Sequence, residues 1–399
     1  MSGRSLAVLG WDGEPLRAAA AARLAAATLV VGGARHLAAV TVPAGARTLV
    51  LGDLEAGVQA LAAHDGPAVV VASGDPGMFG VLRRLRAAGL RPEVHPAVSS
   101  VALAFARAGL PWDEALVTSA HGRDLRRAVA VCRAHPTVAV LTGPGSGPAE
   151  LGAALTGAAR ELFVAEDVGT DAERCTWVSP GAAAAGTWSA LSVVLSVDRA
   201  RAGRPAGWLA GRGQPTGWAL PESAFSHRDA MITKYEVRAL ALARLGPRLG
   251  DLVWDIGAGS GAVGVECARL GAAVVAVEQG PVDHVLANAV AHGVDVQVVH
   301  GTAPGALTGL PDPDAVFVGG GGAAVAEIVR ACVARSPRTV VVALAALDRL
   351  AAVQAALAPY DVDGVQLSSA RLRPLGGATA LAATNPVLLL WGTRPAVAP

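Results

Sequence analysis

The stretch Asp255-Ile256-Gly257-Ala258-Gly259-Ser260-Gly261 follows directly after the apolar run Leu252–Trp254. About one helix and one strand later, the chain reads Val274-Val275-Ala276-Val277-Glu278. A strand, a glycine-rich turn, a helix and an acidic residue at the end of the next strand form the βαβ unit that holds a nucleoside cofactor. The glycines let the backbone approach such a ligand closely, and the Glu278 carboxylate can accept both ribose hydroxyls. The second half of the chain is therefore predicted to bind a nucleoside.

The same stretch leaves the identity of the cofactor open. Gly259-Ser260-Gly261-Ala262-Val263-Gly264 fits G-x-G-x-x-G, the dinucleotide fingerprint, and an ordinary glycine turn is a further alternative. The fuller pattern D-x-G-x-G-x-G resembles the first motif of the Rossmann-like methyltransferases that bind S-adenosylmethionine, and we favour that interpretation. Their ligand has no pyrophosphate, so the resemblance implies a loop around its amino-acid end and ribose. The residues implied to hold it are Asp255, Gly257, Ala258, Gly259, Ser260, Gly261 and Glu278.

Length and composition indicate the class of protein. A chain of 399 residues exceeds what one hydrophobic core usually supports, so we expect two or three domains. Hydrophobic residues make up 52% and charged residues 16%, which is typical of a well-buried globular protein and excludes a disordered one. The formal net charge is +1, so neither nucleic acid nor an anionic membrane is expected as a partner.

No segment of the sequence favours export or a membrane. Residues Met1–Asp12 reach a charge too early for a signal-peptide core. The runs Cys175–Val197 and Pro374–Thr393 lack charges but are broken by Pro and Gly, so we expect buried strands there. The four cysteines are far apart and lack metal-ligand spacing, which predicts free thiols, no metal and a reducing cytoplasm.

Residues 1–200 alternate short β-branched runs with alanine-rich stretches, which predicts an α/β fold with a largely parallel sheet. Strands are expected at Leu6–Leu9, Leu29–Val31, Thr48–Leu51, Ala68–Ala72, Leu116–Ser119, Val138–Leu141, Leu162–Ala165 and Leu191–Val197. Helices are expected at Glu14–Ala27, Met78–Ala88 and Val98–Ala108. Residues 201–222 hold five glycines and three prolines without periodicity, which predicts a linker. Residues 223–399 then form a second domain, beginning with a helix near Lys234–Leu245.

The first half has a glycine motif of its own. Residues 68–80, AVVVASGDPGMFG, read as a buried strand ending in a turn, and Asp75-Pro76-Gly77 is ordinary turn chemistry. The turn nevertheless lies at the carboxyl end of an apparent parallel strand, where α/β folds bind ligands. S-G-D-P-G-M-F-G resembles the G-D-P motif of the tetrapyrrole methylases. Further segments resemble that family at Val8–Gly13, Thr28–His36, Pro96–Ser100 and Ser119–Arg123.

The resemblance implies two α/β lobes with the methyl donor between them, held largely by backbone groups of the G-D-P turn. The donor-binding residues that it implies are Gly74, Asp75, Met78, Ser99, Ser100, Thr142 and Gly143. The family's usual opening G-x-G-P-G reads G-W-D-G here, at residues 10–13, which leaves the role of that loop open.

The second domain has further motifs around its glycine loop. Residues 230–238, AMITKYEVR, resemble the T-K-x-E-[IV]-R entry helix of a methyltransferase that methylates and decarboxylates a corrin precursor. Thr233 with Glu236 also fits a capping box, and a cap at a cofactor site can still offer its hydroxyl to the ligand. Lys234 is the only lysine in the chain, which suggests a specific need. Ala303 falls in the family's adenine-side loop, and residues 314–322 are a strand opening into four glycines at the expected active-site edge.

A tetrapyrrole methylase followed by a Rossmann-like class I methyltransferase resembles a bifunctional family of cobalamin (vitamin B12) biosynthesis. The resemblance implies one S-adenosylmethionine per domain, methylation of a reduced tetrapyrrole at carbons 5 and 15, loss of the ring C acetate carboxyl, and a homo-oligomer. Because that substrate carries many carboxylates, cationic side chains are the natural clamps. The candidates are His121, Arg123, His227, Arg228, Lys234, Arg371 and Arg373, for each of which a solvated surface position is the alternative.

No nucleophile–His–acid constellation is evident, which agrees with methyl transfer because that reaction demands no strong base. Two other classes remain open on the sequence alone. One is a nucleotide-dependent oxidoreductase that uses the first half as a substrate domain, and the other is a non-catalytic scaffold that binds a nucleoside.

Overall fold

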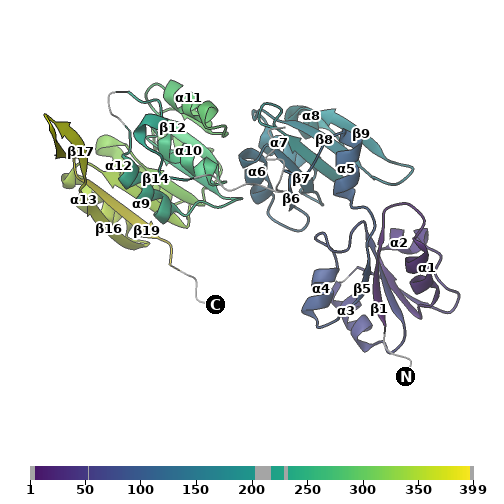
Figure 1. Cartoon of the computed structure of the whole chain (residues 1–399). Helices are drawn as coiled ribbons and strands as arrows, with labels where there is room; N and C mark the ends of the chain where they lie inside the picture. The colour runs from purple at the N-terminus through teal and green to yellow at the C-terminus, as the bar shows by residue number, and fades with distance from the viewer. Residues whose placement is uncertain (1–4, 53, 203–216, 229–231, 396–399) are drawn as a thin grey trace. The chain divides into compact units, whose positions relative to one another are not determined.

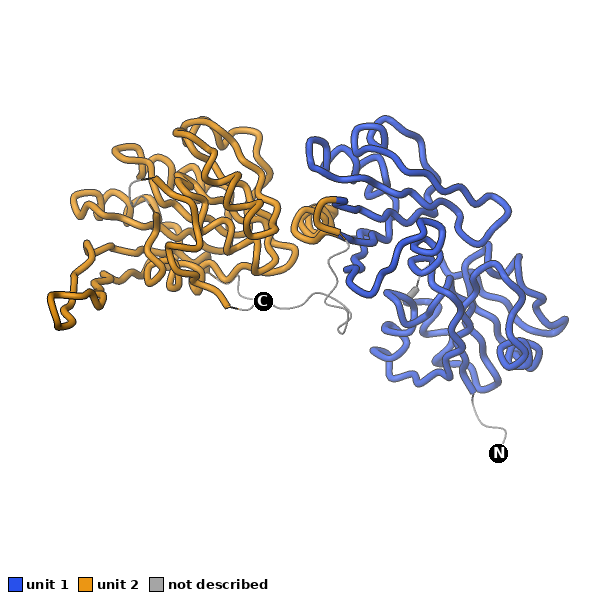
Figure 2. The backbone as a smooth tube through the Cα atoms, turned by 45° about the horizontal axis from the view of Figure 1, so that its top comes forward, with its two compact units in different colours: residues 1–124, 137–199 blue, residues 125–136, 200–399 orange. Residues whose placement is uncertain are grey.

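The structure, a computed structural model, describes residues 5–52, 54–202, 217–228 and 232–395. The chain forms two compact units, residues 1–124 with 137–199 and residues 125–136 with 200–399 (Figure 2). Helix α6 (Leu125–Ala134) groups with the second unit, where Ala130 joins the same apolar cluster as Leu252. Residues 203–216 of the predicted linker, and residues 230 and 231 of the entry motif, lie outside the described residues.

The first unit begins with a five-stranded sheet of order β3-β2-β4-β1-β5 in which every neighbouring pair is parallel (Figure 1). Its strands are β1 (Leu6–Trp11), β2 (Leu29–Gly32), β3 (Arg47–Val50), β4 (Ala68–Ser73) and β5 (Glu93–His95). Its helices are α1 (Ala18–Ala25), α2 (Ala34–Ala39), α3 (Leu54–Ala63) and α4 (Leu82–Ala87). Successive apolar residues of β1, β2 and β4 belong alternately to two hydrophobic clusters, one on each face of the sheet. This is expected of a parallel sheet that is covered on both faces.

A second sheet completes the first unit, with the order β6-β7-β10-β8-β9. Its elements are α5 (Ser100–Ala108), β6 (Leu116–Ser119), β7 (Thr137–Leu141), α7 (Pro148–Leu155), β8 (Glu161–Glu166), β9 (Arg174–Val178), α8 (Pro180–Ala185) and β10 (Ser192–Val197). Only β6 and β7 are parallel, so the prediction of a largely parallel sheet is wrong for this lobe. One cause is the short connection without a helix between β8 and β9, which permits only antiparallel pairing. The other is that β10 inserts between β7 and β8 and runs antiparallel to both.

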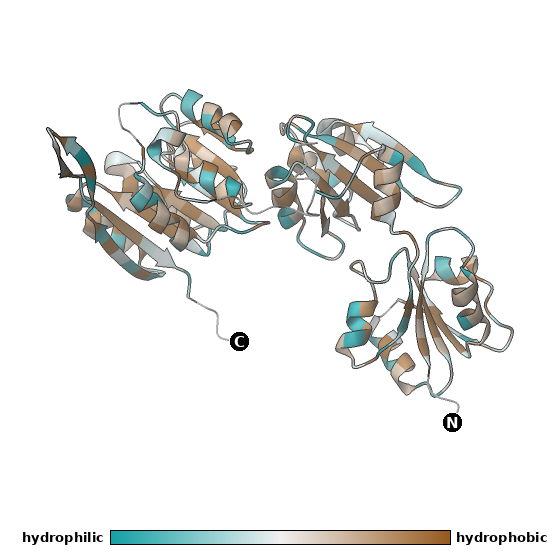
Figure 3. Ribbon diagram, viewed as in Figure 1, coloured by the Kyte–Doolittle hydropathy of each residue, from teal (hydrophilic) through white to brown (hydrophobic). Residues whose placement is uncertain are grey.

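The second unit is built on a seven-stranded sheet of order β13-β12-β11-β14-β15-β19-β16. Its strands are β11 (Leu252–Ile256), β12 (Ala273–Glu278), β13 (Gln297–His300), β14 (Ala315–Val318), β15 (Thr339–Leu344), β16 (Asp361–Leu367) and β19 (Val387–Thr393). Its helices are α9 (Tyr235–Leu245), α10 (Ala262–Arg269), α11 (Asp283–Ala291), α12 (Val325–Val333) and α13 (Leu350–Leu357). Apolar residues gather in the strands of this sheet (Figure 3) and pack into one cluster on each face. The chain order reverses between β11 and β14, which is where open α/β sheets bind ligands.

A separate two-stranded hairpin joins β17 (Ala370–Leu375) to β18 (Ala378–Ala383). Leu375 is 56% exposed and Leu381 is 67% exposed, so the prediction of buried strands for residues 374–393 is wrong for the hairpin and right for β19. The absence of charges misled that prediction, because a hairpin with few partners leaves apolar side chains in solvent. Within the described residues, every helix is too short or too polar to cross a bilayer.

Candidate active sites

The glycine loop of the second unit follows β11, and its shape requires glycine. Gly257, Gly259 and Gly261 all have positive φ, at 69°, 56° and 71°. A Cβ atom added to Gly257 would lie 2.8 Å from the Cα atom of Gly320, in the glycine run that follows β14. The loops after two neighbouring parallel strands therefore touch at the point where the strand order reverses.

Strand β12 orients this loop through hydrogen bonds. The carbonyl of Val277 accepts the amides of Gly257 at 2.8 Å and of Ala258 at 3.2 Å. The Glu278 carboxylate accepts the Gly259 amide at 2.8 Å through Oε2 and the Gly280 amide at 2.7 Å through Oε1. Each carboxylate oxygen has a further lone pair, so Glu278 is held in place and can still accept hydroxyl groups. The Glu278 carbonyl also accepts the Gly301 amide, which brings the loop that contains Ala303 beside it.

Asp255, the first residue of the motif, lies beneath the loop. Its side chain is 1% exposed, and its Oδ2 accepts the Gly264 amide in α10 at 2.8 Å. Its Oδ1 has no partner among the described residues. Burial and, to a lesser extent, the charge of Glu278 raise the pKa of Asp255, the Gly264 amide lowers it, and the net result is a pKa of about 7. In this geometry Asp255 supports the loop and the start of α10.

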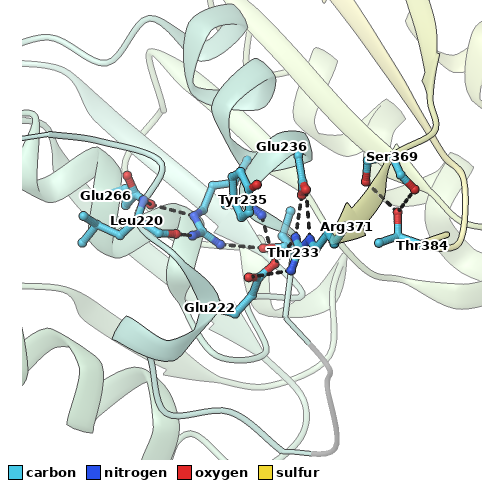
Figure 4. A network of polar contacts seen from close by, with 10 residues as sticks. Leu220, Glu222, Thr233, Tyr235, Glu236, Glu266, Ser369, Arg371 and Thr384 are labelled. Carbon is cyan, nitrogen blue, oxygen red and sulfur yellow. Dashed lines mark hydrogen bonds and ion pairs between the residues drawn. The ribbon is translucent and has the colours of Figure 1, made fainter. Parts of the chain in front are cut away.

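The entry motif is held by a buried arginine rather than by a capping box. Lys234, which is half-buried, is the N-cap of α9 without a side-chain cap, so the predicted Thr233–Glu236 box does not form. Arg238 and Glu266, of which Glu266 is labelled in Figure 4, are both 0% exposed and pair at 2.6 Å. Arg238 also donates to the carbonyls of Thr233 and Leu220, so the backbone of the motif is tied to α10.

Glu236 is instead occupied by Arg371 of the hairpin. The Arg371 guanidinium donates two hydrogen bonds to Glu222 and two to Glu236, between 2.7 and 3.0 Å, and lies 4.7 Å from the Tyr235 ring centroid. Burial raises the pKa of Glu222, but Arg371 and two backbone amides lower it to about 2. Arg371 would have to give up these bonds before it could clamp a substrate carboxylate.

The other cationic candidates of the second unit are not bound in this way. Arg373, on the same strand as Arg371, is exposed. Arg228 is exposed at the end of segment 217–228, and the neighbouring His227 has its Nδ1 buried without a partner among the described residues. The structure therefore leaves Arg373 and Arg228 available to solvent.

The G-D-P turn of the first unit also depends on close backbone contact. Gly74 has a φ of 53° and donates its amide to the Trp11 carbonyl at 2.7 Å. A Cβ atom on Gly74 would lie 3.0 Å from the Cα atom of Ser99. Asp75 accepts the Gly77 amide at 2.8 Å, and the Met78 amide bonds the Asp75 carbonyl. The turn thus brings together the ends of β1 and β4 and the start of α5.

The serine and threonine candidates of this unit have structural partners. Ser99 is the N-cap of α5 and accepts the Ala102 amide at 3.1 Å, and Ser100 is the first residue of that helix. The buried Thr142 hydroxyl donates to the Ser192 carbonyl at 2.6 Å. The Ser99 and Thr142 side chains therefore help to shape these loops.

His121, Arg123 and Gly143 gather at the carboxyl ends of β6 and β7. A Cβ atom on Gly143 would lie 2.6 Å from His121 Nδ1. Arg123 donates to Ser119 Oγ at 2.8 Å, and its guanidinium lies 5.6 Å from the ring centroid of Phe79, the residue after Met78. The structure thus places one predicted clamp next to the predicted donor turn.

One polar cluster at the carboxyl end of β4, next to the G-D-P turn, was not predicted. Arg35 donates to Ser73 Oγ at 2.5 Å, and His36 Nε2 lies 2.9 Å from the same oxygen, directly before Gly74. Burial and the charge of Arg35 lower the pKa of His36 to about 4. The sequence signal was the Arg-His pair that follows the second strand. In the second unit, Arg238, Glu266 and Asn288 were likewise missed, because nothing in a sequence shows that distant polar residues are buried together.

Comparison with known proteins assigns each half to a methyltransferase class. Residues 12–184 match the model of the tetrapyrrole (corrin/porphyrin) methylases. Residues 223–394 match the precorrin methyltransferase domain. Two glycine-lined strand edges in two different α/β frameworks therefore define a protein with two methyltransferase domains, and the predicted fold class is confirmed.

Individual relatives narrow the class. A Sinorhizobium protein named precorrin-6Y C(5,15)-methyltransferase (decarboxylating) is 35% identical over 340 residues, which cover 82% of this chain and 80% of the relative. A Pyrobaculum calidifontis protein named probable cobalt-precorrin-6B C(15)-methyltransferase (decarboxylating) is 36% identical over 182 residues, covering 43% of this chain and 93% of its own. A crystal structure of precorrin-6Y C5,15-methyltransferase from Geobacter metallireducens is 30% identical, covers 44% of this chain and 97% of its own, and has a TM-score of 0.42. The chain belongs to the precorrin-6Y C(5,15)-methyltransferase (decarboxylating) family.

Proposed function

We propose that this chain uses S-adenosylmethionine to methylate precorrin-6Y at carbons 5 and 15 and removes carbon dioxide from the ring C acetate, giving precorrin-8X. The observation that carries the proposal is the pair of glycine-lined strand edges, Gly74–Met78 and Gly257–Gly261, one in each unit. The Sinorhizobium relative that spans most of the chain carries both reactions in its name.

Each domain is proposed to catalyse a different part of the reaction. The first domain, residues 1–200, would methylate carbon 5, and the second, residues 223–399, would methylate carbon 15 and decarboxylate. The Pyrobaculum relative supports this division, since it is named for the carbon-15 reaction with decarboxylation and aligns with less than half of the chain. One donor site per domain follows from the proposal. Residues 217–222 of the predicted linker belong with the second domain instead, because Ala219 and Leu220 donate their amides to Glu266.

In the second domain, the glycine loop and Glu278 fit a nucleoside that carries a sulfonium group. The loop has the positive-φ glycines that a close ligand approach requires, and Glu278 is held so that its free lone pairs can accept ribose hydroxyls. When bound, S-adenosylmethionine supplies the methyl group. The protein's task is then to align donor and acceptor carbon and to exclude water, which can accelerate the transfer greatly. Decarboxylation needs an electron sink, which the conjugated tetrapyrrole provides.

The acceptor is proposed to be an anionic tetrapyrrole bound by cationic side chains at each edge. Arg123 in the first unit and Arg228 and Arg373 in the second are exposed or solvent-facing candidates. Guanidinium groups suit this role because they bind carboxylates with two parallel hydrogen bonds.

Mass analysis of the product tests the proposed function. The full chain is incubated with the tetrapyrrole precursor and S-adenosylmethionine, and the product should gain two methyl groups and lose one carbon dioxide. A parallel incubation with NAD in place of the donor tests the oxidoreductase alternative. An unchanged tetrapyrrole with the donor, or an oxidised one with NAD, would contradict the proposal.

A further inference from the structure

A segment ahead of the entry motif is bound to the helices that follow the glycine loop. Residues 217–228, named the strap here, are fixed first by Glu266 of α10. Its carboxylate accepts the amides of Ala219 at 2.5 Å and Leu220 at 3.0 Å. Phe225 of the strap is buried and lies 4.8 Å from the ring of His292, centroid to centroid. The strap is therefore a packed part of the second unit.

Helix α11 holds the strap with one face. His284, Asn288 and His292 are spaced four residues apart, so they lie along the same side of the helix and its C-cap. His284 Nδ1 lies 2.8 Å from Ser226 Oγ, and His292 Nε2 lies 2.9 Å from the Ala224 carbonyl. Asn288 is between them and contacts the Ser226 backbone.

Asn288 uses its whole amide group in this contact. Its Oδ1 accepts the Ser226 amide at 2.7 Å, and its Nδ2 donates to the Ser226 carbonyl at 2.8 Å and to the Ser260 carbonyl at 2.8 Å. The side chain is 2% exposed. These partners fix the orientation of the amide, because the backbone N–H needs an oxygen and the two carbonyls need the two N–H groups.

Ser260 belongs to the glycine loop, so this amide joins the loop to the strap. The rest of the loop is held from β12, through the Val277 carbonyl and the Glu278 carboxylate. Ser260 is 3% exposed, and its carbonyl points away from solvent toward α11. Among the described residues, Asn288 is the side chain that hydrogen-bonds both the loop and the strap.

We propose that Asn288 is a positioning residue for methyl transfer in the second domain. It holds the Ser260 peptide, and with it the loop that would carry the donor, in register with the strap. The strap ends in His227 and Arg228, which are candidates for binding the tetrapyrrole. The Asn288 amide therefore fixes the position of the donor loop relative to these two residues. This inference rests on the proposed function, because that function makes the loop a donor site.

The test replaces Asn288 by the isosteric Asp in the full chain. At pH 8 the carboxylate has no hydrogen to give to the two carbonyls, so the Kd for S-adenosylhomocysteine at the second-domain site should rise at least tenfold. As the pH falls, protonation restores one donor, and the affinity should recover in part. Asn288→Ala, which adds no charge, should show the same loss without the recovery. Affinity within twofold of wild type in either folded variant, across the pH range, overturns the inference.

His292→Ala is the matched control. It removes another bond from α11 to the strap but touches nothing in the glycine loop, so amide hydrogen exchange should rise at residues 224–228 while the donor Kd stays within twofold. A loss equal to that of the Asn288 variants would assign the effect to a loosened strap and overturn the inference. Wild-type protein that binds no donor in the second domain would instead defeat the proposed function itself.

Discussion

Gly257 and Gly320 approach each other backbone to backbone, at the ends of the neighbouring parallel strands β11 and β14. A Cβ atom on Gly257 would lie 2.8 Å from both the amide nitrogen and the Cα atom of Gly320. The contact ties together two loops that are 63 residues apart in sequence on either side of the point where the strand order reverses. The glycine run after β14 is therefore part of the same site as the Asp255–Gly261 motif.

Gly257→Ala should abolish binding of S-adenosylhomocysteine in the second domain and leave the first-domain site intact. The substitution strains a residue with φ of 69°, at a cost of about 1–2 kcal/mol, and its methyl group meets backbone that cannot rotate away. Calorimetric titration of the full chain measures both sites. Gly293→Ala is the control, because Gly293 has a φ of 65° with nothing within 4 Å of an added Cβ atom. Equal losses in the two variants would refute the role given to the contact.

Arg238→Met should destabilise the second unit by about 3–5 kcal/mol, because it leaves the buried charge of Glu266 without its cationic partner and with only two backbone amides bound to it. Adding Glu266→Gln to the same chain should recover much of that loss, since no charge is then buried. Chemical denaturation monitors both variants. Arg23→Met is a useful comparison, since its pair with Glu93 is about half exposed on both sides and contributes about 0–1 kcal/mol. A single variant no less stable than the Arg23 variant would contradict the account of this buried pair.

Asp255→Asn should change how the stability of the second unit depends on pH. Burial raises the pKa of Asp255 from 3.8 to about 7 in the folded chain, so the folded state keeps this proton to a higher pH than the unfolded state. The free energy of unfolding of the wild type therefore falls between pH 3.8 and about 7, by up to about 1.4 kcal/mol per pH unit. Denaturation curves of the variant should lack this fall. Parallel pH profiles for the two proteins would show that the carboxyl titrates normally.

Arg371→Met should release the β17–β18 hairpin from α9. The pKa of Glu222 is lowered to about 2, so its contribution to stability is present above pH 4.5 and is lost as the pH falls toward 2. Because Arg371 is 33% exposed, the loss at neutral pH should be no more than about 1 kcal/mol. Amide hydrogen exchange in residues 370–383 should rise in this variant and stay unchanged in Arg373→Met, on the same strand. Faster exchange in both variants, or in neither, would show that the bonds of Arg371 to Glu222 and Glu236 do not hold the hairpin on α9.

The sequence predicted the positions of the strands well and the directions of their pairing less well. All eight strands expected in residues 1–200 are present within about two residues, because buried β-branched runs are a strong signal. β5 and β9 were missed, since Glu93–His95 is short and Arg174–Val178 mixes polar and apolar residues. The antiparallel insertion of β10 between β7 and β8 depends on long-range pairing that no local pattern records.

In the candidate sites too, local features could be predicted from the sequence and long-range contacts could not. Glycines at strand ends were found because their conformational role can be read from the sequence, and the structure gives Gly74, Gly257, Gly259 and Gly261 positive φ. The roles of charged residues were harder to predict, because Arg371 and Arg238 look alike in sequence. Arg371 pairs with two partly exposed carboxylates, whereas Arg238 is fully buried. The roles of individual residues toward donor and acceptor stay predictions.

The central claim, one sulfonium donor held in each unit, is tested most directly by calorimetric titration of the full chain with S-adenosylhomocysteine. We expect two molecules bound per chain, of which Gly257→Ala removes one and Gly74→Val the other. A single site that neither substitution affects, or no binding at all, would contradict it.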